Sequence, residues 1–186
     1  KKDIELLSSQ VERCNEILKR LTLNPVEEDE FIDKDLTMRD YLSEIILSFK
    51  EISKKKFIFN FDQFSNVKKI TKSIEIVYGL RNFIGNANKF SKNSIYINLK
   101  SDSEFTEITI EDDGNGYPKD VLSKIGEPYL RSNDPIDKSK TGLGLGLFIG
   151  KTLLEKNFAS INCRNSKTRT GAEVIIKWNN KDLFNI

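Results

Sequence analysis

Cysteine, long apolar runs and an excess of one charge sign are all scarce or missing in this sequence. The two cysteines, Cys14 and Cys163, lie far apart and form no Cys-x-x-Cys pair. This spacing argues against a zinc site and against a secreted fold stapled by disulfides, so we expect a reducing, cytoplasmic setting. No apolar stretch is long enough to cross a bilayer, so we expect membrane attachment only through segments that precede Lys1.

The balance of charge excludes a further class of partner. Thirty basic and 28 acidic residues leave a formal net charge of +2, without the positive excess that neutralises nucleic-acid phosphates. We therefore expect no nucleic-acid partner. Hydrophobic residues make up 38% of the chain and charged residues 31%, which is typical of a globular protein. Its 186 residues suffice for one domain with an appended helix.

The beginning of the sequence predicts a helix and a connector. Apolar residues recur at steps of three and four from Ile4 to Leu21, which predicts one seam of an amphipathic helix. Asn24-Pro25 and the acidic residues that follow predict a connector. We expect a helix within residues 1–24, a linker over 25–36 and a larger domain over 37–186. Neither a start methionine nor a signal pattern precedes the helix, so we expect a piece of a longer protein.

The larger domain alternates helical and strand patterns. Thr37 with Asp40 resembles a capping box at the start of one helix, and Ser73 can cap a second. The expected order is a helix over 38–52, a strand over 57–61, a helix over 74–90, strands over 94–100 and 104–111, a long loop over 114–141 with one short helical piece, a helix over 143–157, and strands over 160–164 and 172–178. This order predicts an α/β fold, a two-layer α+β sandwich with helices on one face of a sheet.

Three polar side chains share one face of the helix expected from Ile74. Asn82, Asn86 and Lys89 fall at i, i+4 and i+7, so two amides and an ammonium point the same way. An amide oxygen suits Mg²⁺, and an ammonium beside it can meet phosphate oxygens. Taken alone, this spacing more often means a solvated helix face.

Two glycine-containing segments follow. Asp112 lies at the end of an expected strand, directly before Gly114 and Gly116, where small residues let a ligand approach and a carboxylate could accept a hydrogen bond from an adenine amino group. An ordinary Asp/Gly turn is the alternative.

The second segment runs from Thr141 through Gly142, Gly144 and Gly146 into a helix. Such a loop offers backbone N–H groups and the positive helix end to a polyphosphate, although close packing of a helix on a sheet would also require glycines. A Walker loop is excluded because Leu145 stands where its first glycine is required, and Ile149 breaks the dinucleotide pattern.

Together and in this order, the segments resemble the four nucleotide-binding boxes of sensor histidine kinases. The boxes correspond to Asn82–Phe90, Asp112–Gly116, Gly126–Arg131 and Gly142–Gly146, and Gly171 matches the small glycine of the last strand pair. The resemblance covers about residues 37–178 and implies a Bergerat-type (GHKL) ATP-binding fold preceded by a dimerisation-bundle helix. The wording of the last two boxes is similar to the RegB/PrrB-type redox-responding kinases.

The resemblance implies that ATP and Mg²⁺ are the cofactors. Asn86 would coordinate the metal, Asn82 would support that site and Lys89 would neutralise phosphate charge. Asp112 would recognise the adenine amino group, while Gly114 and Gly116 would let the backbone close on the base.

The same resemblance implies a lid over residues 117–141 whose hinge holds the phosphates. Thr141, Gly142, Gly144 and Gly146 would form that phosphate site, and Arg131 would reach the γ-phosphate when the lid closes. A glycine before Glu127 and a tyrosine after Pro128 depart from many kinases of the family.

The sequence contains no histidine, so the phosphoaccepting imidazole would lie on a preceding helix outside it. The helix within 1–24 would then be the second helix of the dimerisation bundle, forming a homodimer, and the phosphoryl group would pass to an aspartate of a response regulator receiver domain. The resemblance places this part in the cytoplasm of a bacterium with an inner-membrane-anchored sensor. Cys14 in the helix seam is either a buried core residue or a redox-regulatory thiol, and Cys163 is expected in the core.

Two other functions stay open. The chaperone and topoisomerase ATPases share the nucleotide fold and would explain the asparagine and glycine segments. The Glu127-Pro128-Tyr129 element and the amphipathic helix ahead of the domain argue against them. A nucleotide-sensing module without catalysis is the third possibility.

Overall fold

The computed structural model describes residues 36–62, 69–70, 73–129 and 144–184, all of which belong to one compact unit, Asp35–Ile186. The elements in chain order are β1 Leu36–Thr37, α2 Met38–Ile52, β2 Lys56–Phe61, β3 Lys69–Ile70, α3 Ile74–Phe90, β4 Ser94–Ser101, β5 Phe105–Asp112, α4 Lys119–Leu122, α6 Gly146–Lys156, β6 Ser160–Asn165, β7 Ala172–Asn179 and α7 Asn180–Leu183.

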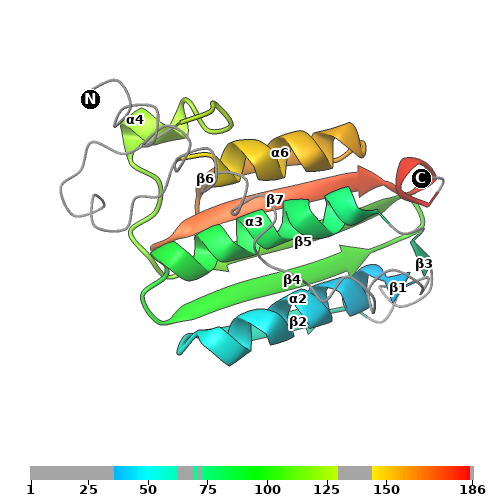
Figure 1. Cartoon of the computed structure of the whole chain (residues 1–186), viewed down its shortest axis with the longest axis horizontal. Helices are drawn as coiled ribbons and strands as arrows, with labels where there is room; N and C mark the ends of the chain where they lie inside the picture. Colours follow the sequence, from blue (N-terminus) through cyan, green and yellow to red (C-terminus); the bar gives the residue numbers. More distant parts are fainter. Residues whose placement is uncertain (1–35, 63–68, 71–72, 130–143, 185–186) are drawn as a thin grey trace, which may run out of the picture. The chain divides into compact units, whose positions relative to one another are not determined.

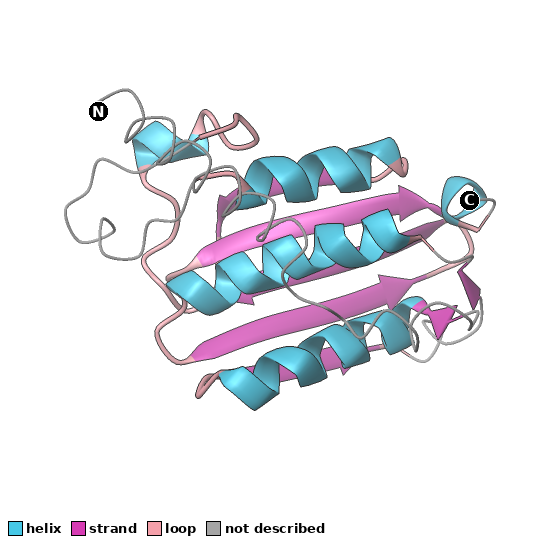
Figure 2. Ribbon diagram, viewed as in Figure 1, coloured by secondary structure: helices cyan, strands magenta, loops and turns pink. Residues whose placement is uncertain are grey.

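A five-stranded mixed sheet forms one layer, with the strand order β2-β4-β5-β7-β6. β2 runs parallel to β4, and the other neighbours are antiparallel. Figures 1 and 2 show α2, α3 and α6 side by side on one face of this sheet. The predicted two-layer sandwich with helices on one face is therefore confirmed.

Two helices begin where the sequence predicted. The Thr37 hydroxyl accepts the N–H of Asp40 at 3.2 Å, while the Asp40 carboxylate accepts the N–H of Thr37 at 2.9 Å, which completes the capping box of α2. The Ser73 hydroxyl accepts the N–H of Ile76 at 3.2 Å at the start of α3. Each cap satisfies N–H groups that have no partner within the helix.

The core lies between the sheet and its helices. Alternate residues of β4, namely Ile95, Ile97 and Leu99, are buried toward the helices, whereas the residues between them are partly exposed on the open face. Trp178 in β7 is fully buried, and its indole N–H donates to the backbone oxygen of Asn157 at 3.0 Å. Fully burying an aliphatic side chain such as Ile95 or Ile97 contributes about 1.5–3 kcal/mol to the free energy of unfolding.

The structure differs from the sequence prediction at the start of α6. This helix begins at Gly146 rather than at residue 143, because Gly144 has a φ of +71°, a left-handed conformation that a right-handed helix cannot continue through. The short β1–β3 pair was also missed, because a two-residue ladder leaves no alternation to detect. The prediction also missed the final helix α7, which is a single turn capped by Asn179.

Some predictions fall outside the described residues. These are the helix within 1–24 with Cys14, the linker 25–36 apart from its last residue, Arg131, Thr141 and Gly142. Across the ranges that the structure does describe, none of the helices has the length and apolar character that crossing a membrane requires.

Candidate functional site

Three segments that the sequence singled out meet at one end of the sheet. β5 ends there at Asp112, which pairs with Ile95 just after the turn that follows α3. α6 begins nearby at Gly146, and it packs along α3. The fold therefore brings the asparagine face of α3, the end of β5 and the start of α6 together.

Asn82 lies where α3 faces the glycines of α6. A Cβ atom on Gly146 would lie 3.6 Å from Oδ1 of Asn82, and one on Gly150 would lie 3.1 Å from the Cβ atom of Asn82. The Asn82 amide N–H donates to the backbone oxygen of Tyr78 at 2.8 Å, which fixes the orientation of its oxygen. The amide therefore faces the glycine turn, as a shared phosphate and metal site would require.

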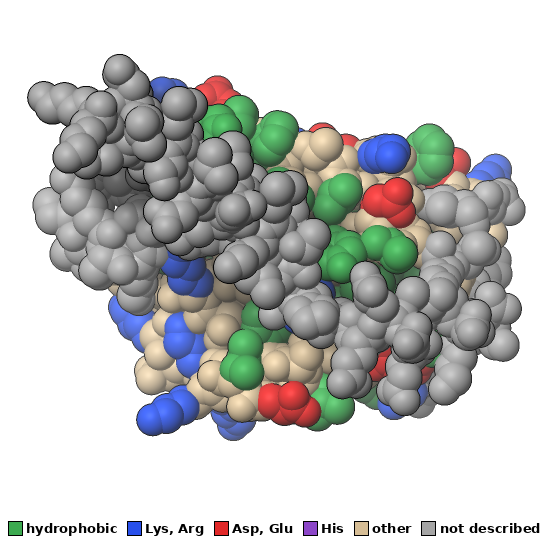
Figure 3. Space-filling model, in the orientation of Figure 1, with side chains coloured by type: hydrophobic (Ala, Val, Ile, Leu, Met, Phe, Trp, Pro, Cys, Tyr) green, Lys and Arg blue, Asp and Glu red, His purple; other side chains and the backbone are tan. Residues whose placement is uncertain are grey.

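Asn86 and Lys89 continue the same side of α3, one and two turns further on. Both side chains are partly exposed, and the Lys89 ammonium lies 5.3 Å from the centre of the Phe90 ring. Figure 3 shows lysine and arginine side chains gathered at the lower left of this face. Lys50, in the last turn of α2, and Lys54, just after it, are exposed. Positive charge at this end of the molecule attracts polyanions.

Asp112 is the buried carboxylate of the site, with 3% of its surface exposed. Its Oδ1 atom accepts the N–H of Gly114 at 2.8 Å and the N–H of Ala172 at 3.2 Å, and neither bond uses Oδ2. Burial raises the pKa of Asp112 above that of an ordinary aspartate, and the two backbone bonds only partly oppose this. The side chain is thus oriented by the backbone and keeps one oxygen for a further hydrogen bond.

Glycines around Asp112 are required by space. A Cβ atom on Gly114 would overlap the backbone oxygen of Phe90, and one on Gly171 would overlap the backbone oxygen of Asp112 itself. Gly116 has a φ of +78°, which a residue with a side chain rarely adopts. The glycines that the sequence singled out here therefore shape the surroundings of one carboxylate.

The comparisons with known proteins agree with this geometry. Residues 71–182 match the family model of the histidine kinase-, DNA gyrase B-, and HSP90-like ATPases. The chain belongs to this ATPase family.

Within that family, the curated relatives are sensor kinases, which favours the kinase interpretation over the chaperone and topoisomerase alternative. Sensor histidine kinase RegB of Cereibacter sphaeroides is 31% identical over 200 residues, which cover 95% of this chain and 42% of that protein. CpxA of Escherichia coli K12 is 29% identical over 87 residues, or 47% of this chain and 19% of that protein. The chain thus spans less than half the length of these relatives.

Solved kinase structures share the fold. The mycobacterial sensor histidine kinase MprB superposes with a TM-score of 0.66 at 19% identity, covering 77% of this chain and 96% of that one. Full-length ShkA in complex with AMPPNP gives a TM-score of 0.64 at 18% identity, covering 78% of this chain and 30% of that one. The described part accordingly has the fold of the solved sensor kinase structures.

A second aspartate of this ATPase domain was not singled out by the sequence. The Asp113 carboxylate accepts the N–H groups of Lys92, Asn93 and Ser94 at 2.7–3.0 Å. Burial by itself would raise the pKa of Asp113, but the three backbone bonds outweigh it and lower the pKa. Asp113 therefore fixes the turn between α3 and β4, and the only sequence signal for it was a second acidic residue before Gly114.

The first part of the predicted lid contacts α6. The short helical piece expected in the loop is α4, and beyond it Gly126 has a φ of +96°. A Cβ atom on Gly126 would lie 2.7 Å from Cδ of Lys151, so the lysine stem packs closely against this segment. The rest of the predicted lid, with Arg131, lies outside the described residues.

Cys163 packs against the core of the domain, beside Tyr117. Burial raises the pKa of its thiol to about 11, so the thiol stays protonated at neutral pH.

Proposed function

We propose that this domain binds Mg-ATP and transfers the γ-phosphate to a histidine on a helix outside the sequence, from which it passes to an aspartate of a response regulator. The observation that carries the proposal is Asp112, a buried carboxylate oriented by two backbone N–H groups and set among glycines. Its Oδ2, which accepts no hydrogen bond from the part of the chain that the structure describes, is suited to the adenine amino group. A hydrogen bond to a charged acceptor in a buried site is worth about 1.5–3 kcal/mol.

The start of α6 is suited to the phosphates. Leu145, at the N-cap, has no side-chain acceptor, so the first N–H groups of α6 are open to an anionic ligand. Gly144 and Gly146 let the chain turn closely there. We propose that Thr141 and Gly142 extend this phosphate site and that Arg131 reaches the γ-phosphate.

The donor set fits Mg²⁺. Asn86 offers an amide oxygen, a hard ligand, and the fixed amide of Asn82 lies one turn away on the same face. Within the described ranges, no group of three acidic, cysteine or histidine side chains could hold an ion alone, which fits a metal that takes most of its ligands from phosphates and water. When bound, Mg²⁺ would neutralise charge on the phosphates, and Lys89 would add a second cation.

The partners belong to the same proposal. We divide the chain into a dimerisation helix within 1–24, a linker over 25–36 and the catalytic domain over 37–186. The helix would pair two copies into a homodimer, and a receiver domain would accept the phosphoryl group. The sensor kinases among the relatives support this arrangement, with this part in the cytoplasm of a membrane-anchored protein.

The test is ATP binding with and without Mg²⁺, by calorimetry, for the wild type and for Asn86→Ala. We expect Mg²⁺ to tighten ATP binding in the wild type and Asn86→Ala to lose about tenfold of that gain, as removal of a metal ligand does. Affinity without Mg²⁺ should stay unchanged. The matched control is Asn98→Ala on the open sheet face, where the Asn98 amide oxygen accepts a hydrogen bond from the Asn60 amide at 3.0 Å.

Two results would count against the proposal in different ways. A wild type that does not bind ATP would refute it as a whole. An Asn86→Ala variant with the full Mg²⁺ effect would refute only the metal role of Asn86.

A further inference from the structure

Glu111 and Asp112 are consecutive residues of β5 whose side chains point to opposite faces of the sheet. Asp112 points toward the helices, and Glu111 points to the open face. Both nevertheless contact the same segment, the turn over residues 166–171 that joins β6 to β7. This β6–β7 turn therefore contacts the end of β5 on both faces of the sheet.

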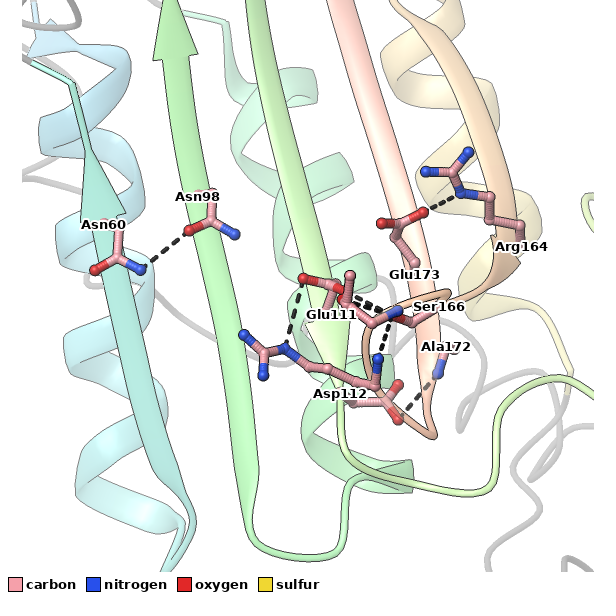
Figure 4. A network of polar contacts seen from close by, with 10 residues as sticks. Asn60, Asn98, Glu111, Asp112, Arg164, Ser166, Ala172 and Glu173 are labelled. Atoms are coloured by element: carbon pink, nitrogen blue, oxygen red, sulfur yellow. Dashed lines mark hydrogen bonds and ion pairs between the residues drawn. The ribbon is translucent and has the colours of Figure 1, made fainter.

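On the open face, Glu111 is the anchor of the turn. Its Oε1 atom accepts the hydroxyl of Ser166 at 2.7 Å and that of Thr168 at 3.2 Å, while Nε of Arg169 lies 3.6 Å from Oε2. Only 6% of Glu111 is exposed. Arg169 also stacks on Tyr96, with its guanidinium carbon 3.5 Å from the ring centre. Figure 4 shows Glu111 beside Ser166 at this turn.

The partner of Glu111 across the sheet is another carboxylate, Glu173. Like charges directly opposite each other destabilise a sheet. Here Arg164 pairs with Glu173, and Arg169 pairs with Glu111. Each of the two opposed carboxylates is thus paired with an arginine, and the partner of Glu111 comes from the turn itself.

On the helix face, the same turn delivers a backbone donor to Asp112. The N–H of Ala172, the first residue after the turn, donates to Oδ1 of Asp112. At the other end of the turn, Asn165 accepts the N–H of Tyr117 at 2.6 Å and donates to its backbone oxygen at 3.1 Å. The two residues that flank the turn therefore contact both ends of the segment from Asp112 to Tyr117.

The turn also has hydrogen bonds of its own: the Ser166 hydroxyl accepts the N–H groups of Thr168 and Arg169 at 3.2 and 3.0 Å. Residues 167–170 are exposed, and across its base the N–H of Ser166 donates to the oxygen of Gly171 at 2.9 Å. Without Glu111, the Ser166 and Thr168 hydroxyls and the Arg169 guanidinium would all lose a shared anchor. The position of the Ala172 N–H would then depend on the strand ladder and on the hydrogen bonds within the turn.

We infer that Glu111 is a positioning residue for adenine recognition: it anchors the β6–β7 turn, which in turn aims the Asp112 carboxylate at the base. The inference rests on the proposed role of Asp112. Its distinctive consequence is selectivity for the base, because only adenine binding depends on the direction in which Asp112 points.

The experiment compares the dissociation constants of ATP and inosine triphosphate, which carries an oxygen where adenine carries its amino group. It uses the wild type, Asp112→Ala, Glu111→Ala and Glu111→Gln. We expect the wild type to prefer ATP, and Glu111→Ala to lose about tenfold of that preference, the scale of one charged hydrogen bond. Glu111→Gln should retain most of it, because its amide oxygen can still accept from Ser166 and Thr168.

The matched control is Glu107→Ala, the same change on the same strand and face, where Glu107 faces Lys177 across the sheet. It should leave the preference unchanged. If Glu111→Ala does not fold, the double variant Ser166→Ala with Thr168→Val removes the hydroxyl donors instead and should lower the preference in the same direction.

Three results would overturn the inference. A folded Glu111→Ala protein, or the double variant in its place, with the wild-type preference would show that the turn does not aim Asp112. A Glu111→Gln variant as impaired as Glu111→Ala would show that the acceptor role is wrong. A wild type without any ATP preference would refute the role of Asp112 and the inference with it. If Asp112→Ala lost the preference but Glu111→Ala kept it, the role of Asp112 would stand and only the role of Glu111 would be refuted.

Discussion

At the scale of single residues, Asp112 and Asp113 show that the pKa values of neighbouring carboxyl groups can be shifted in opposite directions. Asp113 is stabilised as an anion by three backbone N–H groups, which lower its pKa although burial acts the other way. Asp112 has a raised pKa because burial outweighs its two backbone bonds. The first arrangement stabilises a turn, and the second leaves a buried carboxylate only partly compensated by hydrogen bonds.

Replacing Asp112 by asparagine should separate stability from binding. The asparagine oxygen can still accept from Gly114 and Ala172, but its NH₂ group would face the adenine amino group, so ATP affinity should fall at least about tenfold. Because the folded pKa is raised, the ionised wild-type carboxylate lowers stability at neutral pH, and this cost disappears below the ordinary aspartate pKa.

The measurement is urea unfolding of both proteins at neutral and at acid pH. Asp112→Asn should be at least as stable as the wild type at pH 7, with the difference shrinking as the pH falls through the raised pKa. Asp120→Asn, at an exposed position of α4, serves as the control. A variant that is clearly less stable than the wild type at neutral pH would contradict this account.

Residue-level prediction from sequence succeeded where a motif is local. Asp112 was expected at a strand end beside glycines, and the structure places it there. The anchor of the β6–β7 turn could not be predicted, because Glu111 and Ser166 lie 55 positions apart and nothing local to either one signals the other. The roles of Asn82, Asn86 and Lys89 stay predictions, although the structure sets Asn82 against the glycines of α6.

At the scale of elements, capping residues fixed the helix starts that could be predicted. Thr37 and Ser73 mark α2 and α3 because their hydroxyls satisfy N–H groups at the first turn. α6 has no such marker, and its start depends on the left-handed conformation of Gly144, which composition alone does not reveal. The end of α6 is followed by a left-handed residue, Phe158.

Phe158 follows the last turn of α6 with a φ of +62°, and 65% of its surface is exposed. Glycine is the usual residue at such a left-handed position, because a side chain there costs about 1–2 kcal/mol. Phe158→Gly should therefore be more stable than Phe158→Ala by about 1 kcal/mol, even though glycine gains more entropy on unfolding.

Urea unfolding of the two variants checks this comparison, since both lack the phenyl ring and differ only in the methyl group. Equal stability, or a more stable alanine variant, would show that the backbone at this position is not strained.

At the scale of the whole molecule, the layering was predictable and the strand order was not. Helix and strand periodicities give the sequence of elements, and apolar faces require the helices to cover the sheet. Pairing β2 parallel to β4, with β7 between β5 and β6, depends on contacts between distant segments. Only a resemblance to a known family could supply that order in advance.

The absence of histidine from the sequence leads to a prediction about where phosphohistidine can form. Incubated with labelled ATP, the 186-residue chain should acquire no phosphohistidine, because it contains no imidazole. A longer protein that includes the proposed histidine-bearing helix should acquire a label that is stable in alkali and labile in acid. Stable labelling of the 186-residue chain would contradict the proposal that the phosphoaccepting histidine lies outside it. Asn86→Ala in the longer protein provides a negative control.

The donors that orient Asp112 are peptide groups, and this has a consequence for how the protein can diverge. Every amino acid except proline carries such a group, so inherited changes at turn positions that do not contact Glu111, such as Lys167 and Thr170, should leave the direction of the carboxylate intact. What cannot drift are the places where a methyl group would collide with the backbone, Gly114 and Gly171. Homologues with low sequence identity in the β6–β7 turn can therefore present the same carboxylate in the same direction.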